Sequence, residues 1–318
     1  MGTLLLSHEE VGRCLDGLGL LEPMREGFRA HSAGRTGLAQ RVECPIRLLG
    51  TAAVMLPGLV PGIPAYSVKV HGRFPANPLP TQGALLLHDL ESGELLAVMD
   101  SVHLSALASG VVGAVAADAL ARPEASRVAI IGAGTLGSVH LKCLRLVRTL
   151  SHVRVFDSDS DKAHAFAARI HRQLQLPIRV ATSVAEAVKD ADLVVTATSA
   201  REPLLSEEML APGTHVSSFG SDALGKQELT LSCLRAARWV CDDLRLTASL
   251  FAEAELRARP VELGEVLAGM RPGRAAPDEL TVFTSVGLPF VELVAGWQAY
   301  QCAGEEPEHV RFQFAKVV

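Results

Sequence analysis

Aromatic residues are scarce in this chain of 318 residues, where Phe, Trp and Tyr together make up 4%. Hydrophobic residues nevertheless account for 48% and charged residues for 20%, as in compact globular proteins. We therefore expect cores built mainly from Leu, Val and Ala. The length is sufficient for two domains of ordinary size.

Cysteines are also few, and none of the six stands in a C-x-x-C pair that would indicate a zinc or redox site. A reduced, cytoplasmic compartment is the simplest interpretation, and no metal is expected. The net charge is -5 and the basic residues are not clustered, which gives no electrostatic case for nucleic acid.

Long apolar runs are absent as well. Leu4 to Leu6 is too short for a signal sequence, and Leu104 to Ala117 is interrupted by serines and glycines. The second segment falls short of the ~18 residues that a membrane-spanning helix needs. We therefore expect no membrane association.

Residues 127–140 read as a buried strand, a glycine turn and the start of a helix in immediate succession. Gly132, Gly134 and Gly137 match the G-x-G-x-x-G dinucleotide fingerprint, in which glycines allow a tight turn and close approach of a pyrophosphate. The predicted cofactor contacts at this turn are Gly132, Gly134, Thr135, Leu136 and Gly137.

Asp157 follows the next predicted strand, twenty residues after Gly137, where a carboxylate can accept hydrogen bonds from ribose hydroxyls. A carboxylate there repels a 2′-phosphate, so we expect NAD(H) to be preferred over NADP(H). The alternative is a glycine turn in another kind of α/β protein, with Asp157 capping the helix that follows.

The first hundred residues read mainly as antiparallel sheet. Ser7 to Glu10 has capping-box spacing and starts a helix whose Val11, Leu15 and Leu18 share one face. Strands separated by Pro and Gly turns are predicted at 41–49, 51–56, 65–70, 83–88 and 95–99.

From residue 127 onward strands alternate with helices, which predicts a Rossmann-type doubly wound parallel sheet. The fold class is therefore α/β, with a second, mainly antiparallel α+β domain. We expect residues 1–121 with 289–318 to form a substrate-binding and dimerisation domain, and residues 122–288 to form the NAD-binding domain.

The ordered set of motifs resembles the ornithine cyclodeaminase and mu-crystallin family over nearly the whole chain. The resemblance is carried by Tyr66-Ser-Val-Lys69, Pro75-Ala-Asn77, His88-Asp-Leu-Glu-Ser-Gly-Glu94, Ile131-Gly-Ala-Gly134, Thr196-Ala-Thr198, Phe219 to Leu229 and Val282 to Gly287. It implies an NAD(P)-dependent enzyme acting on amino acids or cyclic imines, and a homodimer that pairs through the antiparallel domain.

The resemblance also implies roles for individual residues. Lys69 and Arg41 correspond to groups near the substrate carboxylate, Asp222 to the acid/base beside the substrate amine, and Lys226 to a neighbour of that acid. The residues that it places near the nicotinamide and ribose are Thr196, Thr198, Ser218 and Ser285. The chain departs from the pattern at Ala108, where relatives usually carry an arginine that clamps the carboxylate, so we expect an atypical substrate.

Each role has a plainer alternative. Asp222 could cap a following helix, and Lys69 could point outward into solvent from its strand. Arg47 could serve in place of Arg41. Glu292 stands where relatives often have Asp, and the electrostatics of a helix N-terminus explain it as well as a role in the site does.

The function best supported by these residues is an NAD(H)-dependent oxidoreductase or deaminase that transfers hydride at a carbon bearing nitrogen. The candidate activities are amino acid dehydrogenase, imine reductase and cyclodeaminase. The alternative is a non-catalytic NAD(P)-binding protein with a mu-crystallin-like ligand-binding role, which the loss of arginine at Ala108 would favour.

Overall fold

The computed structural model describes residues 2–37, 39–46, 51–74, 81–251, 259–304 and 309–314. The chain divides into two compact units, 1–108 with 288–318 (unit 1) and 109–287 (unit 2). The first division lies thirteen residues before the expected boundary at 121/122. It falls inside helix α3 (Ser101–Leu120) rather than at its end.

Unit 1 contains a seven-stranded sheet of order β15-β1-β6-β5-β4-β3-β2. Neighbouring strands from β2 to β6 pair antiparallel as predicted, but β1 pairs parallel to β6, so the sheet is mixed. Its strands are β1 (Thr3–Leu6), β2 (Val42–Ile46), β3 (Thr51–Gly58), β4 (Ala65–Arg73), β5 (Thr81–Asp89), β6 (Leu95–Asp100) and β15 (Arg311–Phe312).

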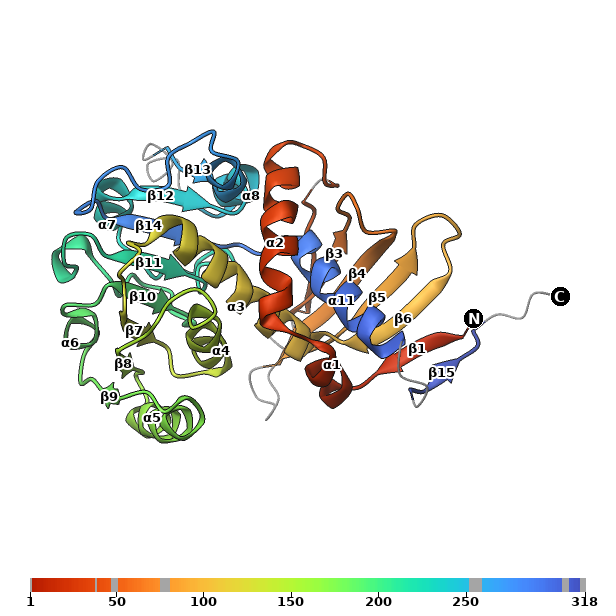
Figure 1. The fold of residues 1–318 in the computed structure, drawn as a ribbon, viewed down its shortest axis with the longest axis horizontal. Helices are drawn as coiled ribbons and strands as arrows, with labels where there is room; N and C mark the ends of the chain where they lie inside the picture. The colour runs from red at the N-terminus through yellow and green to blue at the C-terminus, as the bar shows by residue number, and fades with distance from the viewer. Residues whose placement is uncertain are drawn as a thin grey trace. The chain divides into compact units, whose positions relative to one another are not determined.

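Helices α1 (His8–Cys14), α2 (Gly17–Ser32) and α11 (Pro289–Gly304) belong to the same unit, and α11 packs on β3, β4 and β5 and against α2 (Figure 1). The packing is tight, because a Cβ atom at Gly296 would overlap the side chain of Leu85. The inward-facing residues of β5, Leu85 and Leu87, are fully buried.

The predicted capping box at Ser7 and Glu10 is confirmed, but the expected apolar face through Leu18 is wrong. Helix α1 ends at Cys14, and Asp16 caps a new helix by accepting hydrogen bonds from the amides of Leu18 and Gly19. This break turns Leu18 outward, where it is 60% exposed.

The opposite face of the sheet, which we call the open face, remains partly exposed and apolar. Val42, Met55 and Val70 are aligned across β2, β3 and β4, and all three are exposed. Val68 aligns with half-buried Leu86 on the same face. An apolar row of this kind is typical of a surface that another protein covers.

Unit 2 contains an eight-stranded sheet of order β13-β12-β14-β11-β10-β7-β8-β9, in which every pairing is parallel. Across the sheet, strands β9, β8, β7, β10, β11 and β14 follow one another in the Rossmann order 3-2-1-4-5-6. The strand order reverses between β7 and β10. The strands are β7 (Arg127–Ile131), β8 (His152–Phe156), β9 (Ile178–Val180), β10 (Leu193–Thr196), β11 (His215–Ser218), β12 (Arg238–Cys241), β13 (Val261–Glu262) and β14 (Thr281–Thr284).

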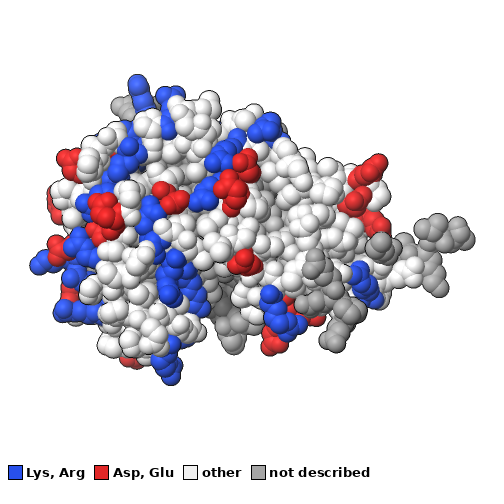
Figure 2. All heavy atoms as spheres, in the orientation of Figure 1, with Lys and Arg blue, Asp and Glu red and all other residues white. Residues whose placement is uncertain are grey.

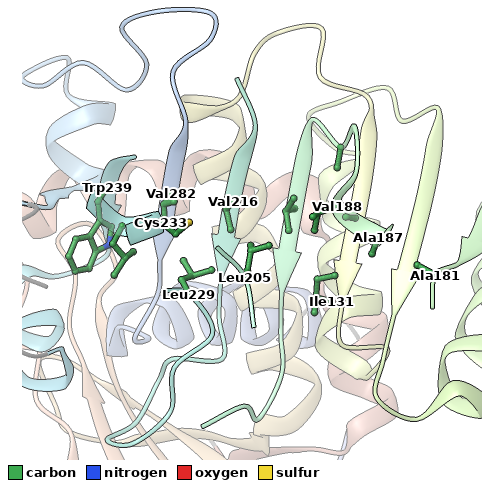
Figure 3. Packing of buried hydrophobic residues seen from close by; sticks show 14 residues of the cluster. Ile131, Ala181, Ala187, Val188, Leu205, Val216, Leu229, Cys233, Trp239 and Val282 are labelled. Atoms are coloured by element: carbon green, nitrogen blue, oxygen red, sulfur yellow. The ribbon is translucent and has the colours of Figure 1, made fainter. Parts of the chain in front are cut away.

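Helical connections separate these strands, and two of them, α6 (Val184–Val188) and α7 (Leu231–Ala236), contribute side chains to an aliphatic core together with the strands (Figure 3). Trp239 is its largest side chain, and its indole nitrogen donates to Thr284 Oγ1 at 2.8 Å. The connections are α4 (Thr135–Leu144), α5 (Ser160–Leu174), α6 (Val184–Val188), η2 (Glu207–Met209), α7 (Leu231–Ala236), α8 (Leu244–Leu250) and α10 (Leu263–Leu267).

The second half of α3 belongs to unit 2 because its glycines allow close contact with α4. A Cβ atom at Gly110 would lie 2.8 Å from Cys143 Sγ, and one at Gly113 would lie 2.6 Å from His140 Nδ1. The whole helix is longer than the apolar segment expected from sequence, and by length and composition alone it could cross a membrane. More than half of it is buried inside the chain, as in the core helix of a globular protein.

Candidate functional site

The glycine turn lies between β7 and α4, at the carboxyl end of β7. Gly132 has φ +106, and a Cβ atom at Gly137 would overlap the carbonyl of Gly132, so both positions require glycine. Gly134, by contrast, faces open space, and Thr135 beside it is exposed. Since Gly134 has no side chain to cap α4, the first amides of that helix are available to an anionic ligand.

Asp157 follows β8 directly and reaches back to this turn. Its Oδ2 accepts from the Ala133 amide at 2.8 Å, and its Oδ1 accepts from the Asp159 amide at 3.0 Å. The cap of the next helix is Asp159, so the capping alternative for Asp157 is wrong. A carboxylate offers about four acceptor positions, and the remaining two can accept from ribose hydroxyls. The turn and this carboxylate together fit a dinucleotide.

Three predicted cofactor residues at the ends of β10 and β11 converge on one side chain that sequence reasoning had not singled out. The carboxylate of Glu228 accepts from the hydroxyls of Thr196, Thr198 and Ser218 at 2.6, 2.8 and 2.7 Å. Glu228, Thr196 and Ser218 are fully buried, whereas Thr198 is half-buried. Glu228 lies within the motif Phe219 to Leu229, and this was the feature of the sequence that could have identified it.

Asp222 lies in the loop after β11, four residues before Lys226, whose Nζ donates to Asp222 Oδ1 at 2.6 Å. No helix follows directly in this part of the described chain, because α7 begins at Leu231 and Thr230 caps it. The capping alternative for Asp222 is therefore wrong. Its carboxylate is 42% exposed, so it can exchange protons with water.

Ser285 follows β14, and its hydroxyl donates to Asp242 Oδ2 at 2.9 Å. The amides of Val286 and Gly287 donate to the same oxygen at 2.7 and 2.8 Å. Burial raises the pKa of Asp242 to about 6 despite these donors. Asp242, which sequence reasoning missed, thus fixes the segment that carries Ser285.

In unit 1, Lys69 points inward from β4 and is buried, so the outward alternative is wrong. Its Nζ donates to Glu292 Oε1 on α11, and to Ser105 Oγ on α3 at 3.2 Å. Ser105 also donates to Glu292 Oε1, at 3.2 Å. Glu292 is therefore the counter-ion of Lys69, which explains a buried carboxylate at that position better than helix electrostatics alone.

Two other predicted residues, Arg41 and Ala108, also belong to unit 1. Arg41 is half-buried and directly precedes β2, and Ala108 is completely buried. Arg47 and the motif at Pro75 to Asn77 lie outside the described residues.

Comparison with known proteins agrees with this fold. A model of the ornithine cyclodeaminase/mu-crystallin family matches residues 1–306. The chain is 30% identical over 300 residues to a Delta(1)-pyrroline-2-carboxylate reductase of Bacillus cereus, covering 89% of this chain and 91% of the relative.

Two solved structures are similar over their full lengths. Thermococcus litoralis Delta(1)-pyrroline-2-carboxylate reductase in complex with NADH and L-proline gives a TM-score of 0.88 at 26% identity, covering 97% of this chain and 100% of that one. An archaeal alanine dehydrogenase dimer with bound NAD gives 0.90 at 27% identity, covering 99% and 100%. The chain belongs to the ornithine cyclodeaminase/mu-crystallin family.

Proposed function

We propose that the protein is an NAD(H)-dependent oxidoreductase or deaminase that transfers hydride at a carbon bearing nitrogen. The observation that carries the proposal is Asp222, a half-exposed carboxylate at the carboxyl edge of a Rossmann sheet that also carries an open dinucleotide turn. Ligands of such sheets bind at that edge. The relatives that bind NADH with L-proline, or NAD, support the same chemistry.

Asp222 would act as the acid/base. In the oxidative direction it takes a proton from the substrate ammonium, so that the lone pair on nitrogen assists departure of the hydride; in reverse it returns the proton. NAD, when bound, accepts or supplies the hydride. Lys226 would hold the Asp222 carboxylate in place until the substrate arrives.

Lys69 and Arg41 would bind the substrate carboxylate. Because Lys69 is already paired with Glu292, its position is fixed before any ligand binds. Such prepositioning avoids the entropic cost of ordering a long side chain.

The substrate is proposed to differ from ornithine, alanine and simple cyclic ketimines, because Ala108 cannot supply a bidentate contact to a carboxylate. Hydrogen bonds to charged groups each contribute roughly 1.5 to 3 kcal/mol. Losing them weakens a small free amino acid by one or more powers of ten. The substrate would then be bulkier, or would carry its carboxylate elsewhere.

NAD(H) is proposed as the preferred cofactor. Asp157 retains acceptor capacity for both ribose hydroxyls and would repel a 2′-phosphate. Fluorescence titration with NADH and NADPH tests the preference, and tighter binding of NADPH contradicts it.

A homodimer through the open face of unit 1 is part of the proposal. The aligned Val42, Met55 and Val70 provide an apolar surface, and an alanine dehydrogenase of similar structure is a dimer. Sedimentation of Met55→Glu beside the wild type tests this: the variant should be monomeric, and an unchanged dimer contradicts the choice of face.

The function is tested by following NADH absorbance with a panel of amino acids, N-substituted amino acids and imines, in both directions. Turnover by the wild type and its loss in Asp222→Asn support the proposal. Tight NADH binding without turnover of any compound would instead support the alternative, a ligand-binding protein of the mu-crystallin kind, which Ala108 favours.

A further inference from the structure

The carboxylate of Glu228 accepts five hydrogen bonds although the residue is completely buried. Its Oε2 accepts from Thr196 Oγ1, Ser218 Oγ and the Gly220 amide at 2.6, 2.7 and 2.8 Å. Its Oε1 accepts from the Thr198 amide and hydroxyl at 2.7 and 2.8 Å. All five donors are neutral, and together they replace the hydration that the carboxylate loses on burial.

The same residue links the segments that follow β10 and β11. The carbonyl of Glu228 accepts from the amides of Leu204 and Leu205, and its own amide donates to Ser221 Oγ at 3.2 Å. A Cβ atom at Gly220 would overlap the carboxylate. The side chain of Glu228 therefore helps to hold the loop that carries Asp222 against the end of β10, in addition to backbone hydrogen bonds between the two segments.

This arrangement fixes the direction of the hydroxyl protons. Each hydroxyl has one proton to donate, and those of Thr196, Thr198 and Ser218 are all directed to Glu228. Thr198 is the least buried of the three, and its Oγ1 also accepts from the Ala200 amide at 3.2 Å. What remains on Thr198 Oγ1 for a ligand is one acceptor position.

We propose that Glu228 is a positioning residue that presents Thr198 to the cofactor as a hydrogen-bond acceptor only. The partner that it selects must donate, and the carboxamide NH2 of the nicotinamide is such a donor. The inference rests on the proposed function, because it assumes that NAD(H) binds at this edge of the sheet. It adds that ionised carboxylate and phosphate oxygens, which cannot donate a hydrogen bond, are excluded from the position beside Thr198 Oγ1.

The test compares binding of NADH with binding of its reduced 3-acetylpyridine analogue, in which a methyl group replaces the amide nitrogen. Fluorescence titration of the wild type should show NADH binding about 3- to 10-fold more tightly, the range for one neutral hydrogen bond. Thr198→Val should bind the two cofactors equally.

A matched control is Thr182→Val. Thr182 also donates its hydroxyl to a glutamate, Glu186, at 2.7 Å, but this pair is exposed and follows β9, the outermost strand of the sheet, which β7 and β8 separate from β10. This variant should retain the wild-type preference for NADH.

Glu228→Gln tests the positioning role without changing side-chain volume. In this variant an NH2 group takes the place of one carboxylate oxygen. In the place of Oε2 it would face the Gly220 amide, and in the place of Oε1 the Thr198 amide, and neither amide can accept a hydrogen bond. We expect the preference for NADH over the analogue to fall to about 1. If Glu228 had only a structural role, the variant would bind NADH and the analogue more weakly by the same factor, and the ratio of the two dissociation constants would not change. Glu186→Gln is the matched control.

The outcomes separate the two proposals. If the wild type binds neither NADH nor NADPH, the proposed function is wrong. If it binds NADH but does not discriminate against the analogue, or if Thr198→Val discriminates as the wild type does, the inference about Glu228 is wrong. Thr198→Val decides the matter even if Glu228→Gln does not fold.

Discussion

Two lysine–carboxylate pairs, one in each unit, differ in their exposure to water. In unit 1 the side chains of Lys69 and Glu292 are 9% and 10% exposed, and Ser105 bonds to both. In unit 2 the side chains of Lys226 and Asp222 are 18% and 42% exposed. Both pairs join a lysine ammonium group to a carboxylate, but their different exposure to water suits them to different roles.

A buried pair cannot be separated cheaply, because each charge left alone would lack both water and counter-ion. An exposed pair contributes little to stability and opens readily. Lys69 is therefore suited to holding a fixed charge, and Asp222 to gaining and losing a proton during turnover. Three predictions test this distinction, and a fourth extends it to a buried carboxylate of unit 2 that has arginine partners.

The largest effect is expected for Glu292→Gln, which leaves the Lys69 ammonium buried without a counter-ion. The free energy of unfolding should fall by roughly 3 to 5 kcal/mol, as measured by urea denaturation. The double variant Lys69→Met/Glu292→Leu removes both charges and should recover most of this loss. Stability of Glu292→Gln within 0.5 kcal/mol of the wild type, roughly the level of a surface substitution, would show that the pair is not needed.

Asp222→Asn should lower turnover by about 10²-fold, the usual scale for a positioned acid/base. Its stability should change by less than about 1 kcal/mol, because the pair with Lys226 is exposed. Its affinity for NADH should be retained. Steady-state rates, NADH affinity and thermal melts of the same preparations check the three expectations. Normal turnover, or early melting, contradicts the assigned role.

Asp192 shows the effect of arginine partners in unit 2 and predicts a loss of stability in acid. Burial alone would raise the pKa of Asp192. Hydrogen bonds from the side chain of Arg127 and from the amides of Arg127 and Ser126 outweigh burial and lower this pKa to about 2. Since the folded value lies below the unfolded one, near 3.8, the stabilisation is present above pH 4 and is lost as the pH falls towards 2.

The contribution of Asp192 is roughly 2 kcal/mol. In Asp192→Asn this contribution is absent at every pH, so its stability and that of the wild type should converge between pH 4 and pH 2 in urea titrations. Asp190→Asn, a neighbouring exposed acid, serves as the control. A constant difference down to pH 2 contradicts the shift.

The smallest effect is expected for Lys226→Met. Removing the partner of an exposed carboxylate should change the free energy of unfolding by about 0.5 kcal/mol. Turnover should nevertheless fall, because the Asp222 carboxylate loses the ammonium group that holds it in place. Unchanged steady-state turnover would mean that Lys226 does not act on Asp222 during the reaction.

Sequence patterns predicted the Rossmann sheet well because its strands are short apolar runs between glycine, proline and helix-capping residues. Strand β7 ends at Ile131, directly before the glycine turn, and β8 ends at Phe156, directly before Asp157, as predicted. Patterns were weaker where a distant partner decides the structure. Strand β1 is four residues long and pairs with β6, some ninety residues later in the chain.

The site was only partly predicted, because some of its contacts also depend on partners far away in the chain. Motif residues indicated Asp222, Lys69 and Asp157, but the partners of buried charges depend on tertiary contacts. Glu292 lies 223 residues from Lys69, and no local pattern connects them. Glu228 was visible as part of a motif, but only the folded chain shows five donors around its carboxylate.

The discontinuity of unit 1 has a consequence during synthesis on the ribosome. Unit 2 is one uninterrupted segment, whereas strands β1 to β6 of unit 1 are translated long before α11, the helix that packs on β3, β4 and β5. At ~5 to 20 residues per second, roughly 10 to 45 s separate Lys69 from Glu292. During that interval α11 cannot yet cover the inner face of β3, β4 and β5, and exposed apolar surface of this kind is prone to aggregation and is what chaperones bind.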